Sequence, residues 1–168
     1  MYKSGDVVVY PGTGVCKIVD IITQKFARTE EKTYYVLKPL YDNADTTVYC
    51  PVDNCNIKIR KLLSEGDVTL LIREAESSES LWIENDNERK KAFASIVKED
   101  DRVKLLRLII ELHTKRIEKE KEGKKLHLSD EKILHQAEKV IHEELACTMG
   151  MSVEDVAAFV MKEMNIEV

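Results

Sequence analysis

The sequence lacks any long uninterrupted apolar run, and this absence limits where the protein can reside. A membrane-spanning helix needs about 20 consecutive apolar residues, and no segment approaches that length. The opening residues, MYKSGDVVVYPG, also lack the apolar stretch of roughly 7 to 15 residues that marks a secretory signal. We therefore expect a cytoplasmic protein without a membrane partner.

Cysteine is also scarce, because the 168 residues include only Cys16, Cys50, Cys55 and Cys147. Cysteines so few and so scattered do not build the disulfide framework of a secreted domain, so we expect reduced thiols. A structural zinc site usually shows two close ligand pairs, whereas here only Cys50 and Cys55 are close together. Further ligands for such a site would have to come from His135, His142 and Cys147. We expect these residues to fill core positions, and we predict neither a metal nor a cofactor.

Motifs for enzymatic chemistry are missing as well. No GxxxxGK[ST], GxSxG or HExxH stretch occurs, and PGTG lies between two predicted strands rather than between a strand and a helix. His113, His135 and His142 fall on or beside apolar helix faces, where a histidine is more often packed than catalytic, and His127 falls in a loop. We therefore predict no enzymatic activity and no small-molecule substrate, and a small enzyme is the least favoured interpretation.

The chain does contain 43% hydrophobic and 34% charged residues, which is typical of a folded protein with one ordinary domain or two small ones. Its net charge of −5 is unevenly spread. Residues 89–125 carry 13 Lys and Arg against 7 Asp and Glu, so this segment is basic within an acidic chain. We expect this segment, rather than the whole chain, to meet an anionic partner.

Two hydrophobic periodicities divide the chain. Up to residue 61, short segments rich in Val, Ile, Tyr and Thr are separated by turn signals such as PGTG and DNAD. They predict five strands, at 6–10, 14–22, 32–38, 46–50 and 56–60, and hence a small closed β-barrel of the Tudor or SH3 kind. From residue 62 onward, apolar residues recur every three or four positions, as on one face of a helix, and predict an all-α bundle of about five helices. The expected fold class is therefore α+β by domains, with domains at 1–61 and 62–168.

Capping signals and apolar faces locate the expected helices. Asp100 or Asp101 can cap a helix that Gly123 stops, Ser129 can cap the next, and Ser152 and Asp155 can begin the last. The residues expected to face the core are Val68, Leu71, Ile72, Ala75, Phe93, Ile96, Val103, Leu106, Ile109, Ile110, His113, Ile117, Ile133, Ala137, Val140, Ile141 and Leu145.

The single tryptophan, Trp82, is followed closely by cations. If a helix begins near residue 81, Trp82 shares one side of it with Asn85 and Arg89, at i+3 and i+7. A lone tryptophan usually packs in a core, where burial removes ~150 to 250 Å² of its surface from water. An exposed aromatic beside cations can instead act as a wedge or stack on a base of nucleic acid. The pattern alone leaves both interpretations open.

Several segments resemble a known bacterial family. GDVVVYPGTGVCKIVDI, KTYYVLKPL and VYCPVDN look like the opening of the CarD/CdnL transcription-factor family, and GKKLHLSDEKILHQAEKVIHEELA is similar to a later family motif. The resemblance covers about residues 1–150 and aligns Trp82 with the family's single tryptophan. Transcription-repair coupling factors share the opening motif, but they are long helicases, and the absent Walker motif excludes that assignment.

The resemblance implies two contacts. The barrel would dock edge to edge on the RNA polymerase β subunit, and the helical domain would touch promoter DNA at the upstream fork of the bubble. The residues implied in polymerase binding are Gln24, Lys25, Val48, Tyr49 and Cys50. The residues implied in DNA binding are Trp82, Asn85, Arg89, Lys90, Lys91, Lys124 and Lys125. Relatives commonly follow the tryptophan directly with arginines, whereas this chain places Glu84, Asp86 and Glu88 there.

We therefore expect a non-enzymatic transcription regulator that bridges RNA polymerase and promoter DNA and stabilises the open complex. A protein-only adaptor, whose two domains bind proteins and not DNA, is the alternative. Binding of forked promoter DNA by the helical part would separate the two hypotheses.

Overall fold

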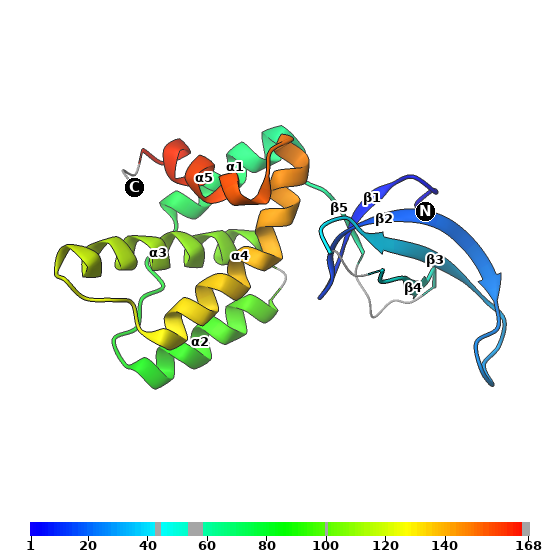
Figure 1. The fold of residues 1–168 in the computed structure, drawn as a ribbon, viewed down its shortest axis with the longest axis horizontal. Coiled ribbons are helices and arrows are strands. Elements are labelled where there is room, and N and C mark those ends of the chain that lie inside the picture. The colour runs from blue at the N-terminus through cyan, green and yellow to red at the C-terminus, as the bar shows by residue number, and fades with distance from the viewer. Residues whose placement is uncertain (43–44, 54–58, 100, 166–168) are drawn as a thin grey trace. The chain divides into compact units, whose positions relative to one another are not determined.

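The structure is a computed structural model that describes residues 1–42, 45–53, 59–99 and 101–165. The chain divides into two compact units, Met1–Leu62 and Leu63–Val168. Strands form the first unit and helices form the second (Figure 1). Within the described residues, an antiparallel sheet of five strands is followed by five α-helices, which confirms the predicted fold class.

The first unit is one sheet with the strand order β4-β3-β2-β1-β5. Its described strands are β1 (Val7–Tyr10), β2 (Gly14–Gln24), β3 (Lys32–Pro39), β4 (Val48–Pro51) and β5 (Arg60–Lys61). Most of the predicted strand 56–60 lies outside the described residues. β2 and β3 pair over most of their length, with a β-bulge between Ile18 and Asp20. The described pairings leave β4 and β5 as the two edges of the sheet.

A small apolar core holds this sheet together. It consists of Val8, Cys16, Ile18, Tyr35, Leu37 and Cys50. The PGTG segment forms the turn between β1 and β2, where Gly12 and Gly14 have φ values of +81° and +101°. Only glycine adopts such a conformation at little cost, which explains this turn signal in the sequence.

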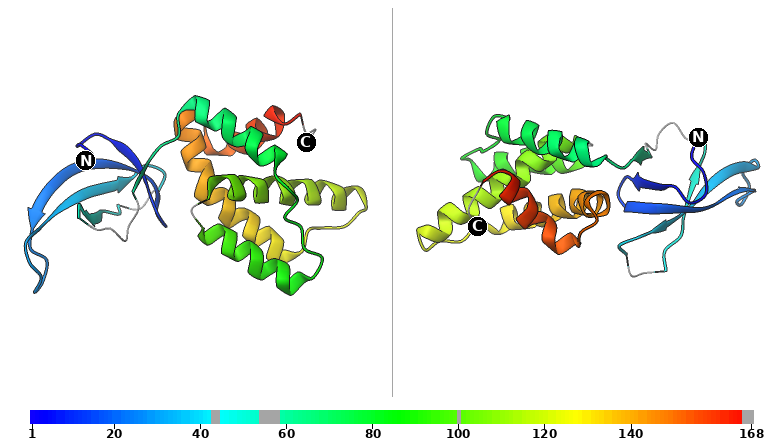
Figure 2. Two further views of the ribbon diagram at one scale, coloured as in Figure 1. Left: turned by 180° about the vertical axis from the view of Figure 1, so that it is seen from behind. Right: turned by 90° about the horizontal axis from the view of Figure 1, so that it is seen from above.

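The second unit packs its helices around one larger core. Its described elements are α1 (Glu65–Ser77), α2 (Asp86–Lys98), α3 (Arg102–Lys121), α4 (Leu128–Met149), the 3-10 turn η1 (Val153–Asp155) and α5 (Val156–Glu163). Figures 1 and 2 show α3 lying between α1 and α2. No helix in the described part of the chain is both long and apolar enough to cross a membrane.

Most of the predicted helical core is confirmed. The apolar faces of α1 and α2 are buried as expected, from Val68 to Ala75 and at Phe93 and Ile96. Val103, His113 and Ile117 are half buried rather than buried. The prediction for Val140 was wrong, because Val140 is 37% exposed. It lies at the margin of the buried α4 face, whose members are Ile133, Leu134, Ala137, Ile141 and Leu145.

The predicted limits of α3 are confirmed. Asp101 is its N-cap, and the Asp101 side chain accepts a hydrogen bond from the Lys104 backbone N–H at 3.1 Å. Gly123 lies just past the end of α3 with φ +70°, as a helix-stopping glycine should. Asp100, the other proposed cap, lies outside the described residues.

Two other predicted helix starts were wrong. α4 begins at Leu128 because the ring of His127 accepts the Ser129 N–H and acts as the N-cap, so Ser129 itself lies inside the helix. α2 begins at Asp86 rather than near residue 81, because the Asn85 side chain accepts the Glu88 N–H at 3.0 Å and caps the helix there. Trp82 therefore lies outside the helix.

Candidate nucleic-acid and polymerase interfaces

Trp82 lies in a non-helical segment, residues 78–85, that joins α1 to α2 and that we call the tryptophan loop. The Trp82 side chain is half buried and packs against the helical core. Its ring lies beside Phe93, with 6.3 Å between ring centroids and a 58° angle between planes. Trp82 is thus partly a core residue, and part of its surface remains accessible to a partner.

Arg89 fastens the C-terminal side of the tryptophan loop. Its guanidinium forms a bidentate pair with Asp130, from Nε to Oδ1 at 3.0 Å and from Nη2 to Oδ2 at 2.8 Å. Nη1 donates to the backbone carbonyls of Ile83 and Glu84 at 2.9 and 3.3 Å. Nη2 also donates to Asp86 at 2.7 Å, so all five N–H donors of the side chain have acceptors.

The role of Arg89 differs from the one implied by the resemblance. Its side chain is 2% exposed and fully engaged, so it has no free donor to offer to a phosphate. Its hydrogen bond with Asp130, together with that to Asp86, raises its pKa and keeps it charged. The guanidinium carbon also lies 4.4 Å from the centroid of the Trp82 ring. We therefore reassign Arg89 from DNA contact to support of the tryptophan loop.

Glu111 fastens the N-terminal side of the same loop. This buried carboxylate of α3 accepts the Ser80 hydroxyl at 2.9 Å and the Leu81 backbone N–H at 3.4 Å. Arg107 donates to the same carboxylate at 2.9 Å and balances its charge. Sequence reasoning missed Glu111, although a carboxylate inside the apolar run RLIIEL is a signal that it needs a buried partner.

Two lysines of α3 lie near Trp82 and were also missed. The Lys115 ammonium lies 4.9 Å from the centroid of the Trp82 ring and 3.3 Å from Glu118. Beside the ring is a hollow of about 240 Å³. The charged residues that line it are Glu84, Asp86, Arg89, Lys115, Glu118, Lys119 and Glu122. The spacing of Lys115 and Lys119, one helical turn apart in the basic segment, is the signal that could have found them.

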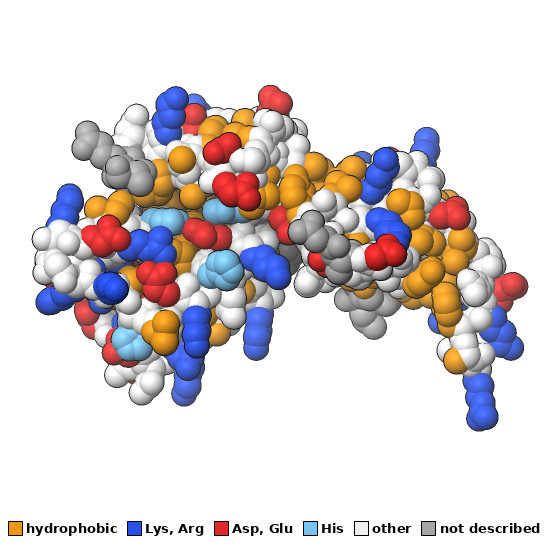
Figure 3. Space-filling model, viewed as in Figure 1, with side chains coloured by type: hydrophobic (Ala, Val, Ile, Leu, Met, Phe, Trp, Pro, Cys, Tyr) orange, Lys and Arg blue, Asp and Glu red, His pale blue; other side chains and the backbone are white. Residues whose placement is uncertain are grey.

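The lysines implied in DNA binding are all exposed. Lys90 and Lys91 directly follow buried Arg89 on α2, and Lys124 and Lys125 lie in the connection between α3 and α4. Lys124 lies 3.6 Å from Glu122, in an exposed pair of little strength. Figure 3 shows Lys and Arg side chains projecting from the edge of the helical unit where α2 lies, interspersed with acidic side chains.

The acidic residues after Trp82 are exposed too, but they are not equivalent. Asp86 is paired with Arg89, and this hydrogen bond is the main reason why the pKa of Asp86 is lowered. His127 and Lys119 also act on Asp86 electrostatically, so the start of α2, the end of α3 and the α3–α4 connection lie close together. Glu84 and Glu88 are exposed on the surface, where they oppose an approaching phosphate. Asn85 is exposed, and its side chain is used as the α2 cap.

In the first unit, the edge strand β4 carries three of the residues implied in polymerase binding. Val52 N–H donates to the Thr33 carbonyl at 2.9 Å, and β4 continues from there along β3, with Tyr49 opposite Val36. Hydrogen-bonded and non-bonded pairs alternate in an antiparallel ladder, so the backbone N–H and C=O of Tyr49 point away from β3. Cys50 is 2% exposed, so its side chain belongs to the core and only its backbone lies on the edge.

An aromatic contact brings the two implied polymerase-binding segments together. The Phe26 ring lies 4.9 Å from Tyr34 and 5.2 Å from Tyr49, measured between centroids. Phe26 directly follows Gln24 and Lys25, which are both exposed at the end of β2. Tyr49 is 46% exposed and Val48 is half buried, so this end of the sheet combines an open strand edge with an accessible aromatic side chain.

A buried histidine lies elsewhere in the helical unit. His113 Nε2 is 2.6 Å from Glu138 Oε1, and the neighbouring His142 is 5% exposed with no partner for its Nε2. Burial lowers the pKa of His142. Among the described residues, no group of three or more His, Cys, Asp or Glu could hold a metal ion. Cys55 lies outside those residues, and Cys16, Cys50 and Cys147 are reduced thiols.

Comparison with known proteins concerns the first unit. Residues 2–63 match the sequence profile of the CarD-like/TRCF RID domain, and the match ends where the helical unit begins. No curated protein matches the chain. A domain of this type points to interaction with RNA polymerase and to transcription regulation. The first unit of this protein is therefore a CarD-like RNA-polymerase-interacting domain.

Proposed function

We propose that the protein is a non-enzymatic transcription regulator that binds the RNA polymerase β subunit through its first unit and promoter DNA through its second. By holding the upstream fork of the bubble, it stabilises the open complex. The observation that supports the DNA-binding half of this proposal is that hydrogen bonds to Glu111 and Arg89 hold the tryptophan loop in place on both sides of Trp82.

A wedge residue must hold its place while DNA is deformed around it. Unstacking one base step costs a few kcal/mol, and stacking a base on an aromatic ring returns roughly 1 to 3 kcal/mol. A freely moving loop would lose part of that gain to ordering entropy. Arg89 and Glu111 order the loop before DNA arrives, so the accessible part of the Trp82 side chain is already in position to meet a base.

The surrounding lysines supply the phosphate contacts. Lys90 and Lys91 are exposed on α2, Lys124 and Lys125 are exposed in the α3–α4 connection, and Lys115 lies against the Trp82 ring. A DNA strand that contacts the ring therefore brings its phosphates within reach of the Lys115 ammonium. Because Glu84 and Glu88 oppose the same phosphates, we expect moderate affinity for DNA alone, with the polymerase contact holding the protein at the promoter.

Strand pairing at β4 supports the polymerase half of the proposal. An edge strand with outward N–H and C=O groups can accept a strand from a partner, in which main-chain hydrogen bonds supply affinity and side chains supply choice. Strand β4 offers such an edge at Tyr49, whose ring packs against Phe26. Gln24 and Lys25, just before Phe26, are exposed.

The test uses the fluorescence of Trp82, which is the only tryptophan in the chain. The full-length protein is titrated with a forked promoter duplex and with a fully paired duplex of the same sequence. We expect the fork to quench Trp82 emission and to shield it from iodide, with a smaller effect from the paired duplex. If the protein binds RNA polymerase but neither duplex changes Trp82 emission, the protein-only adaptor is the correct hypothesis.

A further inference from the structure

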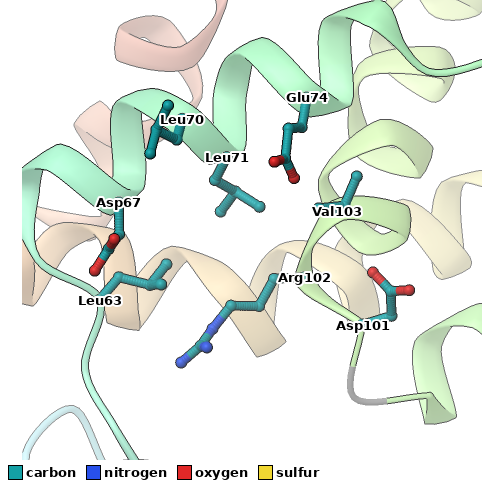
Figure 4. Close-up of a pocket in the computed structure, with 8 residues that line it drawn as sticks. All are labelled: Leu63, Asp67, Leu70, Leu71, Glu74, Asp101, Arg102 and Val103. Atoms are coloured by element: carbon teal, nitrogen blue, oxygen red, sulfur yellow. The ribbon is translucent and has the colours of Figure 1, made fainter.

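A second surface of the helical unit lies between α1 and the first turn of α3. Here a hollow of about 490 Å³ opens to solvent between apolar side chains (Figure 4). Leu71 forms its floor, and half-buried Leu63 and Val103 line its sides. Leu70 completes the lining although it is 57% exposed, and the helical core does not use it. The result is a groove, lined in part by apolar side chains, that no described residue of the helical unit fills.

Charge on α1 is arranged along this groove. Asp67, Leu70, Leu71 and Glu74 are spaced three or four residues apart and share one stripe of the helix. The stripe therefore alternates carboxylate, leucine and carboxylate over about 10 Å, at 1.5 Å per residue. Figure 4 shows the Glu74 carboxylate directed into the opening between α1 and α3.

The opposite wall of the groove adds to the negative charge. Asp101 lies at the start of α3, where its carboxylate accepts the Lys104 backbone N–H and caps the helix. The hydroxyl of Ser64 donates to Asp67 and lowers the pKa of that carboxyl, so Asp67 is ionised at neutral pH. Among the described residues of the lining, Arg102 is the one cation, and it forms an ion pair with fully buried Glu144.

This surface is unsuited to nucleic acid and separate from the tryptophan loop. Its carboxylates repel phosphates. The groove lies at the first turn of α3, whereas Lys115 and Lys119 beside Trp82 lie 12 or more residues further along the same helix. At 1.5 Å per residue, Val103 in the groove and Lys115 beside Trp82 are roughly 18 Å apart along α3.

We propose that this groove binds a protein partner through an amphipathic helix that carries a basic residue, an aliphatic residue and a basic residue at i, i+3 or i+4, and i+7. The aliphatic side chain enters between Leu70, Leu71 and Val103, where it is removed from water. The two cations flank it and meet Glu74 at one end and Asp67 or Asp101 at the other. The protein then has a third contact surface, which recruits a basic helix rather than DNA.

The experiment uses the full-length protein and a synthetic helical peptide with Lys, Leu and Lys at i, i+4 and i+7 among alanines and glutamines. Its dissociation constant is measured by fluorescence anisotropy, and amide chemical shifts of the protein locate the site. We expect shifts at Leu71 and Val103, and roughly tenfold weaker binding to Leu70→Ser, which loses about one buried leucine side chain. Glu74→Gln should weaken binding several-fold and reduce its salt dependence.

Matched controls separate the groove from general attraction to an acidic protein. Glu76→Gln removes an exposed carboxylate from α1 outside the groove, and Leu128→Ser removes an exposed leucine from α4. Both variants should bind the peptide as the unsubstituted protein does, and a peptide with Glu in place of Lys should not bind. Equal losses in all four variants, no saturable binding, or competition by forked DNA would each overturn the proposal.

Discussion

Arg89 and Asp130 form an ion pair that is almost completely removed from water, with exposures of 2% and 1%. A buried charge is tolerated only when its partner and its hydrogen bonds are all present. Because the same guanidinium also holds the carbonyls of Ile83 and Glu84, the pair couples the stability of the bundle to the position of Trp82.

Arg89→Met should therefore destabilise the helical unit by roughly 3 to 5 kcal/mol, since it leaves the Asp130 carboxylate buried and unpaired. Trp82 emission during urea unfolding reports on this unit alone, because the chain has no other tryptophan. The double variant Arg89→Met with Asp130→Asn should recover part of the loss by removing the buried charge. A loss below about 1 kcal/mol for the single variant would show that the pair does not support the loop.

His142 should make the helical unit less stable in mild acid. Burial depresses the pKa of His142 below the ordinary value of about 6.5. Just below that pH, His142 is therefore protonated in the unfolded chain but still neutral in the folded chain. The contribution of neutral His142 to the free energy of unfolding is therefore fully present above about pH 6.5 and is lost as the pH falls below that value. Glu138 partly opposes the depression and His113 adds to it, and Arg116 also acts on Glu138.

The measurement compares urea unfolding at pH 7 and pH 5 for the unsubstituted protein, His142→Gln and His135→Gln. His135 is exposed on the same helix and serves as the control. We expect His142→Gln to lose less stability on acidification, by up to about 1.4 kcal/mol for each unit by which the pKa is depressed. Identical losses in all three proteins would assign the acid sensitivity to other groups.

At the scale of elements, the strands and the core faces of the helices were predictable because their signals are local. The β-branched and aromatic residues in KTYYVLK and the helical spacing of apolar residues in DVTLLIREA reflect which residues of each element are buried. The start of α2 was not predictable from periodicity, because two candidate starts compete. Asn85 makes the cap, and long-range bonds from Arg89 and Glu111 hold residues 80–84 outside the helix. Partners 30 or 41 residues away leave no periodic signal.

Helix α2 should present its phosphate contacts at its N-terminal half. Reversing the charge of Lys90 and Lys91 to Glu should weaken binding of forked DNA and flatten its salt dependence, by about one unit of slope for each lost phosphate contact. Lys98→Glu, an exposed change in the last turn of the same helix, is the matched control. An unchanged slope in the double variant would mean that these lysines serve only solubility.

Strand β4 should bind polymerase through its main chain. Tyr49→Pro removes an N–H that points away from β3, so the sheet should persist, because edge strands tolerate proline there. Binding to RNA polymerase should nevertheless fall strongly in a pull-down or anisotropy assay. Tyr49→Ser removes the ring contact with Phe26 but keeps the N–H, and it should bind better than Tyr49→Pro. Equal binding by both variants would contradict strand pairing at this edge.

At the scale of the whole molecule, the two units differ in their cores and in the surfaces that they offer to partners. The first has a small core and an open edge strand, and the second has a larger core, a fastened tryptophan loop and an acidic groove. The change from strand periodicity to helical periodicity near residue 62 predicts this division. The sequence could not show which cation holds the tryptophan loop and which could contact DNA. Arg89, Lys90 and Lys91 are three consecutive cations, and only their burial in the structure separates them.

The most direct test of the account is the lifetime of the promoter open complex. RNA polymerase and promoter DNA are combined with the full-length protein, and decay is followed after addition of a competitor that traps free polymerase. We expect the protein to lengthen the lifetime and Trp82→Ala to return it close to the value without the protein, with circular dichroism showing an intact fold. A folded Trp82→Ala variant that lengthens the lifetime as much as the unsubstituted protein would contradict the account.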